Sequence, residues 1–259
     1  MLAHATGFCG PALVPMAREL HSHVHGVALD ERGHGASPRP PNGDYDWHGF
    51  GLDVLAVIDR LGLERPLGFG HSCGGAALLL AEQMRPGTFA ALYCFEPIVY
   101  PGDEPLAPDL GNPMSAAALR RRSTFGSRHD AIANFAGKAP FNLLAADVLD
   151  AYVDNGFEPV DGVIALRCRR EDEAAVFSQA LSHDAFAHLG EVRCPVTLAC
   201  GSETDAIGPD HLGLLAARLP HVATTVLPGI GHFGPLQDPA AVGASVVRAL
   251  VPMTDTPGA

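Results

Sequence analysis

Short apolar runs alternate with amphipathic stretches at both ends of the chain. Each run is four to six residues long and is followed by a Gly-, Pro- or Asp-containing turn, a pattern typical of buried strands. Strands are therefore predicted over 25–30, 66–69, 90–95, 195–200 and 223–227. Helical patterns separate several of these runs, and this alternation is the signature of a parallel sheet with helices on both faces. The predicted fold class is α/β.

The predicted helices differ in how strongly their pattern is marked. Between Phe50 and Leu61 apolar side chains recur at helical spacing, at Leu52, Leu55, Ile58 and Leu61. Asp53 and Asp59 are expected to face solvent on that helix. Further helices are predicted near 15–20, over 75–81, and from Pro239, which suits a first helical position, through Leu250.

The middle of the chain has a different character. It opens on a loop rich in Pro and Gly, and it continues with a basic cluster over 120–122 and helical stretches around Ala131, Val148 and Ala174. We interpret it as a mostly helical insertion that covers one edge of the sheet. The charged stretch from Arg167 to Glu173 reads as a solvated helix face. The predicted division is a core over 1–96 and 186–259, with a cap insertion over 97–185.

Composition narrows the classes of partner. The 259 residues carry 17 Lys and Arg against 29 Asp and Glu, a formal charge of −12. Such acidity disfavours nucleic acid and anionic membranes as partners. Six scattered cysteines read as free thiols of a reducing compartment. With no signal-peptide pattern and no membrane-length apolar run, a cytoplasmic location is expected.

The alternating His21, His23 and His25 indicate a strand edge rather than a metal site, and neither metal nor cofactor is expected.

Gly70-His71-Ser72-Cys73-Gly74 is the most informative motif. A short apolar run precedes it, and strong helix formers follow it. This context predicts a serine on a sharp turn between strand and helix, where small residues are required two positions on either side because the backbone is strained and closely approached. A serine hydroxyl is a poor nucleophile, so it needs a base and an acid that orients the base.

The candidates for those two roles follow the last two predicted strands. His232 lies just after the final strand and is the candidate base, and Asp205 lies after the preceding strand and is the candidate acid, with Glu203 as the runner-up. Open α/β sheets build their sites at the carboxyl ends of strands. The chain order Ser72, Asp205, His232 is also the one expected when a single such sheet assembles all three.

An oxyanion requires backbone donors. The N–H of Cys73 directly follows the nucleophile at a helix start, where unpaired N–H groups favour negative charge. The second donor is expected from the turn over 4–8. Thr6 is the first choice, and Gly7 or Phe8 stays open. Cys73 itself is not expected to be the nucleophile, because its side chain would point away from the oxyanion hole.

Four motifs in this order resemble the α/β-hydrolase fold superfamily, and they lie at residues 4–8, 30–37, 70–74 and 231–233. The resemblance implies an eight-stranded, mostly parallel sheet with a helical cap between its sixth and seventh strands. It implies the same five site residues named above, with Asp30 and Arg32 fixing the turn after their strand. Only three residues precede the first motif, so N-terminal strands of the family are expected to be missing, or the true start to lie upstream of Met1.

The expected function is that of a serine hydrolase cleaving an acyl bond of a small molecule, most simply an apolar carboxylic ester, through an acyl-Ser72 intermediate. A serine nucleophile excludes the branches of the family that use aspartate. Lactonase, thioesterase, carbon–carbon bond hydrolase and cofactor-free haloperoxidase activities stay open, as does a non-catalytic ligand-binding protein. Candidate residues for the lining of a substrate pocket are taken from the cap: Phe125, Phe135, Phe141, Leu144 and Tyr152.

Overall fold

The computed structural model describes residues 1–102 and 104–252. Its centre is a sheet of parallel strands in the order β2-β1-β3-β4-β8-β9. The strands are β1 (Leu2–Ala3), β2 (Ala28–Leu29), β3 (Leu67–His71), β4 (Ala91–Phe95), β8 (Val196–Gly201) and β9 (Val222–Leu227). The α/β class is thus confirmed, and every apolar run that predicted a strand contributes one to this sheet.

The sheet has six strands within the described residues, two fewer than the family resemblance implies. The strand predicted over 25–30 is short, because only Ala28–Leu29 pairs, in register with Leu2–Ala3. It forms the edge of the sheet beyond β1. His21 and His23 lie in a turn, and His25 lies in irregular chain before β2, all three exposed. The prediction of a strand edge at these histidines is therefore wrong.

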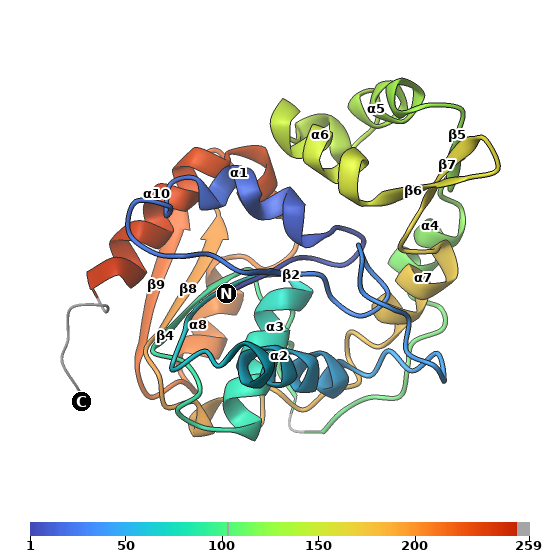
Figure 1. Ribbon diagram of the computed structural model, residues 1–259. Helices are drawn as coiled ribbons and strands as arrows, with labels where there is room; N and C mark the ends of the chain where they lie inside the picture. The colour runs from blue at the N-terminus through green and yellow to red at the C-terminus, as the bar shows by residue number, and fades with distance from the viewer. Residues whose placement is uncertain (103, 253–259) are drawn as a thin grey trace.

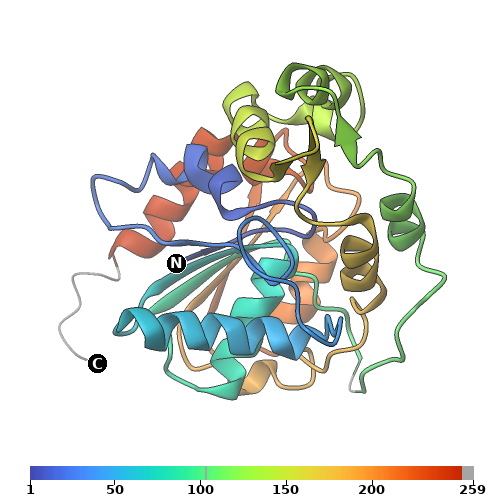
Figure 2. The same cartoon turned by 45° about the vertical axis from the view of Figure 1, so that its right-hand side comes forward.

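Helices cover both faces of the sheet (Figure 1; Figure 2). Helices α1 (Val14–Ala17) and α10 (Pro239–Leu250) cover one face, and α2 (Trp47–Leu61), α3 (Cys73–Met84) and α8 (Pro209–Ala216) cover the other. The shorter helices are η1 (Gly10–Leu13), η3 (Leu189–Glu191) and α9 (Gly234–Gln237). Two apolar clusters, one on each face, make up the core.

Helix α2 buries Ile58 of the predicted stripe, but Phe50 and Val54, rather than Leu52 and Leu61, complete its buried face. Its buried side chains include Phe50, Val54 and Ile58, whereas Leu52 is 56% exposed and Leu61 is also exposed. Residues 50, 54 and 58 follow the same helical spacing, so periodicity alone allowed either stripe. Close approach to α3 selects this one, because a Cβ at Gly51 would lie 3.1 Å from the Leu80 Cβ.

The cap insertion lies between β4 and β8, over one end of the sheet (Figure 1). Its elements are α4 (Pro113–Leu119), β5 (Thr124–Phe125), α5 (Arg128–Ala136), η2 (Phe141–Leu143), α6 (Ala146–Asn155), β6 (Phe157–Val160), β7 (Val163–Leu166) and α7 (Arg170–Ser178). The helices around Ala131, Val148 and Ala174 are confirmed. The small antiparallel sheet β5-β7-β6 was not predicted, because its strands are short and cross-paired over long sequence separations.

Hydrogen bonds join the cap to both sides of the core. The Ala145 N–H donates to the Leu236 carbonyl at 2.9 Å, and the Trp47 indole N–H donates to the Val176 carbonyl at 3.0 Å. The Arg39 guanidinium pairs with Asp172 at 2.7 Å. These contacts involve helices α6 and α7, so the cap is tied at two separate points.

The prediction of a solvated face over 167–173 is wrong for Asp172 and Glu173. Asp172 is 3% exposed and Glu173 is 5% exposed. Each is paired with an arginine from elsewhere, Asp172 with Arg39 and Glu173 with Arg121. Pairing with an opposite charge is what allows two adjacent carboxylates to be buried.

The remaining global expectations concern thiols, metals and membranes. All six cysteines are buried and unpaired, as predicted. Over residues 1–102 and 104–252, no group of three or more His, Cys, Asp or Glu side chains is arranged to hold a metal ion. In the same part of the chain, every helix is too short or too polar to cross a bilayer.

Candidate active site

Ser72 lies at the junction of β3 and α3, in a backbone conformation that L residues rarely adopt (φ 57°, ψ −116°). The two flanking glycines explain how the chain makes this turn. A Cβ at Gly70 would lie 2.6 Å from the Gly74 carbonyl oxygen, and a Cβ at Gly74 would lie 2.4 Å from that of Ala3. Both distances are inside contact range, so larger residues are excluded. The strained turn holds Ser72 at the carboxyl edge of the sheet, as the motif predicts.

His232 reaches this serine from the segment after β9. Its Nε2 lies 3.2 Å from the Ser72 Oγ, and its Nδ1 lies 2.7 Å from an Oε2 of Glu96. Because a carboxylate only accepts, the Nδ1 carries the proton and the Nε2 is free to accept from the serine hydroxyl. A serine, an imidazole and a carboxylate thus form one hydrogen-bonded chain.

The carboxylate in this chain is Glu96 and not Asp205. Glu96 directly follows β4, has a positive φ of 45° and is fully buried. Its carboxylate also accepts from the Gly201 N–H at 2.9 Å and from the Thr204 hydroxyl at 2.7 Å. Asp205 and the runner-up Glu203 are exposed. The loop after β8 therefore turns Thr204, not its neighbouring acids, toward the site, and the expectation for Asp205 is corrected.

A signal for Glu96 was present in the sequence. The pair Glu96-Pro97 ends the run that predicts a strand over 90–95. The same rule that selected Asp205, an acid at the carboxyl end of a strand, applies equally to Glu96. Chain order does not separate the two acids, because Glu96 and Asp205 both lie between Ser72 and His232.

His71 fixes the backbone of His232. The His71 imidazole is buried, and its Nε2 lies 2.8 Å from the His232 carbonyl oxygen. Burial and the neighbouring His232 lower the pKa of His71 well below its usual range. The ring is therefore neutral and donates to that carbonyl through its Nε2–H, so the contact holds the backbone of His232 and not its imidazole.

The backbone N–H groups of the two expected oxyanion donors, Thr6 and Cys73, make no hydrogen bond within the described residues. Of the three candidates in the turn over 4–8, Gly7 donates its N–H to His34 Nε2 at 3.0 Å and Phe8 donates its own to the Ala5 carbonyl at 3.1 Å. The N–H groups of Thr6 and Cys73 have no acceptor elsewhere in the described part of the chain. Burial raises the pKa of the Cys73 thiol well above its usual range, so this side chain is a thiol rather than a thiolate.

Two buried imidazoles brace that turn. The Glu31 N–H donates to His4 Nε2 at 3.0 Å, and the Gly7 N–H donates to His34 Nε2. Both rings must be neutral to accept these bonds. Burial lowers the pKa of His4 to about 4, and burial together with His4 lowers that of His34 to about 3. The turn that carries Thr6 is thus held by acceptors that protonation would remove.

Asp30 and Arg32 act on the turn after β2. Asp30 accepts from the N–H groups of Gly10 at 2.7 Å and Ala36 at 2.8 Å. The Arg32 guanidinium donates two hydrogen bonds to the Asp53 carboxylate, at 2.6 and 2.8 Å. Neither side chain contacts the chain of Ser72, His232 and Glu96, in agreement with a structural part for both.

A cavity of about 320 Å³ adjoins the turn over 4–8. It is lined by Thr6 and Phe8 on the core side and by Phe233, the residue after the candidate base. Phe135 and Phe141 of the cap also line it. The other three expected pocket residues are absent from its lining and are buried in the cap interior instead: Phe125, Leu144 and Tyr152.

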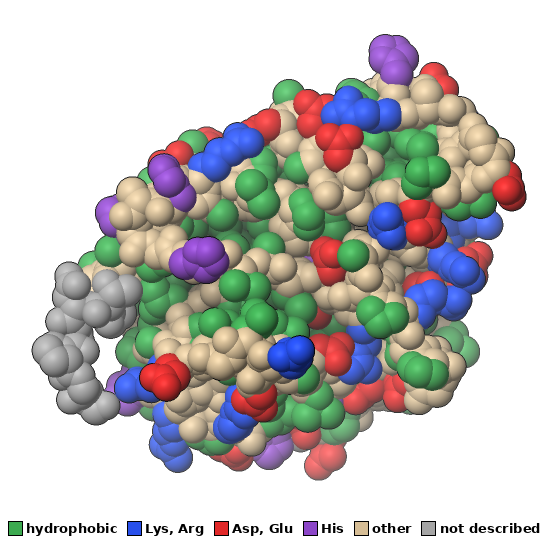
Figure 3. Space-filling model, viewed as in Figure 1, with side chains coloured by type: hydrophobic (Ala, Val, Ile, Leu, Met, Phe, Trp, Pro, Cys, Tyr) green, Lys and Arg blue, Asp and Glu red, His purple; other side chains and the backbone are tan. Residues whose placement is uncertain are grey.

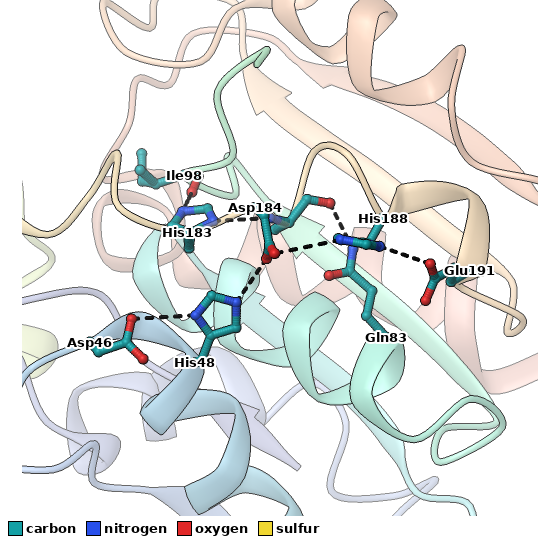
Figure 4. Close-up of polar contacts among 9 residues, drawn as sticks. Asp46, His48, Gln83, Ile98, His183, Asp184, His188 and Glu191 are labelled. Atoms are coloured by element: carbon teal, nitrogen blue, oxygen red, sulfur yellow. Dashed lines mark hydrogen bonds and ion pairs between the residues drawn. The ribbon is translucent and has the colours of Figure 1, made fainter. Parts of the chain in front are cut away.

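A second polar cluster, which shares no residue with the chain of Ser72, His232 and Glu96, is drawn in Figure 4. His48 of α2 contacts Asp184 at 2.8 Å, and Asp184 lies 3.5 Å from His188. Burial lowers the pKa of His48, but its hydrogen bonds to Asp184 and Asp46 outweigh it and raise that pKa overall. This cluster joins α2 to the segment before β8, so we assign it to stability.

Comparisons with known proteins agree with this fold. Residues 1–244 match the model of a family described as the alpha/beta hydrolase family, and the chain belongs to that family. Over 220 residues the chain is 24% identical to a 2-(acetamidomethylene)succinate hydrolase of Mesorhizobium japonicum, which covers 85% of this chain and 76% of that protein.

Two solved structures resemble the chain in fold. One is the peroxisomal alpha-beta-hydrolase Lpx1 of Saccharomyces cerevisiae, with a TM-score of 0.82 and 16% identity, covering all of this chain and 77% of that one. The other is an E-2-(acetamidomethylene)succinate hydrolase, with a TM-score of 0.81 and 20% identity, covering 95% of this chain and 89% of that one. The family and its named relatives support hydrolase chemistry for this chain.

Proposed function

We propose that the chain is a serine hydrolase that cleaves an acyl bond, most simply a carboxylic ester, through an acyl-Ser72 intermediate. The observation that carries the proposal is the continuous hydrogen-bonded chain from the Ser72 Oγ through His232 to the Glu96 carboxylate. A ligand-binding protein has no need to strain a serine backbone and to bury a carboxylate behind an imidazole at the same sheet edge.

In the first half of the proposed reaction, the Ser72 Oγ attacks the substrate carbonyl while His232 Nε2 accepts the hydroxyl proton. The oxyanion that forms accepts from the N–H groups of Thr6 and Cys73, which lie free for it. Glu96 accepts from Nδ1 and stabilises the imidazolium. The intermediate collapses as the proton passes from Nε2 to the departing alkoxide, leaving an ester on Ser72.

In the second half, a water molecule repeats the attack on the acyl-Ser72 carbonyl. His232 accepts a proton from that water and returns it to the Ser72 Oγ as the acid product leaves. No redox change or external group is needed, so the atoms balance as ester plus water giving acid plus alcohol. A thioester or lactone would follow the same steps with a different leaving group.

A probe and a substrate panel test the proposal together. A fluorophosphonate is expected to label wild-type protein once, at Ser72, and 4-nitrophenyl esters are expected to be hydrolysed. Ser72→Ala should lose both, with turnover reduced by several powers of ten. The matched control is Ser127→Ala, which removes the exposed N-cap hydroxyl of α5 in the cap. Folded wild-type protein that takes up no label and hydrolyses no ester, thioester or lactone would support the binding protein instead.

A further inference from the structure

The cavity beside Thr6 carries a charge opposite to that of the whole chain. Four of the 17 Lys and Arg side chains line it: Arg120, Arg121, Arg122 and Lys138. Among its lining residues in the described chain, Glu173 is the single carboxylate. The protein as a whole has 29 acidic residues and a charge of −12. A cationic lining in so acidic a molecule concentrates anions at that point.

Arg121 is already neutralised within the protein. Its guanidinium pairs with Glu173, donates to the Tyr152 hydroxyl at 2.7 Å and lies 5.4 Å from the centre of the Phe141 ring. Gly7 lies directly against this pair, since a Cβ there would meet the Glu173 carboxylate at 2.5 Å. Arg121 and Glu173 thus form a fixed wall between the cap and the turn that carries Thr6.

The other three cations have no carboxylate partner within the described residues. Arg122 donates to the Thr124 carbonyl at 2.9 Å and lies over the Phe125 ring at 4.4 Å. Lys138 donates to the Asn134 side-chain oxygen at 2.8 Å. Arg120 makes neither an ion pair nor a side-chain hydrogen bond there. Elsewhere on the cap, basic and acidic side chains are interspersed (Figure 3). Arg128, for example, pairs with Asp150 and Asp154.

We propose that this cavity binds the free carboxylate of an anionic substrate. That substrate is an ester whose carboxylate lies a few bonds from the carbonyl attacked by Ser72. The proposal rests on the proposed hydrolase function and narrows its substrate class. Thr6 and Phe233 place the cavity beside the reacting groups, and its volume of about 320 Å³ suits a short acyl chain. Arg120, Arg122 and Lys138 supply the positive charge. The apolar ester expected from the sequence is thereby replaced by an anionic one.

Two esters of matched shape test the proposal. Mono-4-nitrophenyl glutarate and 4-nitrophenyl pentanoate have the same acyl chain and leaving group, and they differ in a terminal carboxylate against a methyl group. We expect kcat/KM of wild-type protein to favour the glutarate by roughly 10- to 100-fold, since hydrogen bonds to charged groups contribute about 1.5–3 kcal/mol. The preference should weaken as salt rises.

Variants assign the preference to the cavity. The double variant Arg120→Gln/Lys138→Gln should bring the ratio of the two kcat/KM values close to one. The control Arg128→Gln removes one positive charge from the cap outside the cavity, and it should keep the wild-type ratio. The ratio compares two substrates of one protein sample, so a loss of folded protein cancels.

The outcomes separate this inference from the hydrolase function. Equal rates on the two esters, or a ratio unchanged in the double variant, overturn the inference and leave the hydrolase function standing. Faster hydrolysis of butanoyl-CoA than of either ester would assign the cations to phosphate groups and also overturn it. If the protein takes up no fluorophosphonate label and hydrolyses none of the esters, thioesters or lactones, the hydrolase function fails, and calorimetric titration with glutarate decides the inference alone. Binding that the double variant weakens supports it, and absence of binding overturns it.

Discussion

The edge of the sheet and the cap border the same cavity, but they are built by different kinds of interaction. At the sheet edge backbone geometry determines the structure, because the turn at Ser72 excludes any side chain at Gly70 and Gly74. In the cap, side-chain contacts determine the packing, and the Arg121–Glu173 pair joins segments 52 positions apart. Backbone rules leave a mark in a short motif, whereas a pair between distant segments leaves none. The turn at Ser72 was accordingly predictable, and the Arg121–Glu173 pair was not.

The largest expected effect tests which carboxylate belongs to the sheet edge. Glu96→Gln keeps the shape but removes the charge beside His232, and it should lower kcat for an ester by about 10³- to 10⁴-fold, as loss of the triad carboxylate does in other serine hydrolases. Asp205→Asn is the matched control and should change kcat less than about 3-fold, within the range of an exposed substitution. The opposite ranking would return the role to Asp205.

The second effect concerns the buried pair of the cap. Glu173→Gln leaves Arg121 with its charge buried and unpaired, which costs roughly 3–5 kcal/mol when one partner of a buried pair is removed. Glu171→Gln, at an exposed position two residues earlier on α7, is the control and should change the free energy of unfolding by less than about 0.5 kcal/mol. Urea unfolding measures both. Equal, small effects would mean that the pair does not hold the cap.

Acid should destabilise the turn over 4–8 before it affects the second polar cluster, that of His48, Asp184 and His188 (Figure 4). In the folded state the pKa of His4 is lowered to about 4 and that of His34 to about 3, below the value of about 6.5 in an unfolded chain. The unfolded state then binds protons first, so stability is full above about pH 6.5 and falls toward pH 4, by roughly 3 kcal/mol for one shift of this size.

His48 has the opposite sign, because its pKa is raised. Its contribution is full below about pH 6.5 and is lost as pH rises through the folded value. Urea unfolding at pH 7.5, 6 and 5 measures both trends. We expect His48→Gln to keep the loss of stability on the acid side, which depends on His4 and His34. A His48→Gln variant equally stable at pH 7.5 and pH 5 would contradict neutral, accepting imidazoles at the turn over 4–8.

The smallest expected effect tests the buried face of α2. Val54→Ala removes two buried methyl groups and should cost about 1–3 kcal/mol, whereas Leu52→Ala, at an exposed position, should stay within about 0.5 kcal/mol. Thermal or urea unfolding compares the two. A larger loss at Leu52 would support the stripe that the sequence pattern first suggested.

The limits of prediction from sequence follow from the same contrast. The parallel strands, the turn at Ser72 and the approach of His232 to it follow from local patterns and from the rule that strand ends share one edge. Glu96 was missed because two strand ends carry an acid, and only the path of the loop after β8 decides between them. The stripe on α2 depended on its neighbour α3. Asp172 and Glu173 looked solvated because their arginine partners lie far away in the sequence.

The most direct test of the account is the crystal structure of the protein after reaction with a fluorophosphonate. We predict a phosphorus–oxygen bond at the Ser72 Oγ and a phosphonyl oxygen about 3 Å from the N–H groups of Thr6 and Cys73. His232 should keep Glu96 at its Nδ1. A label on another residue, a phosphonyl oxygen facing away from both N–H groups, or Asp205 in contact with His232 would contradict it.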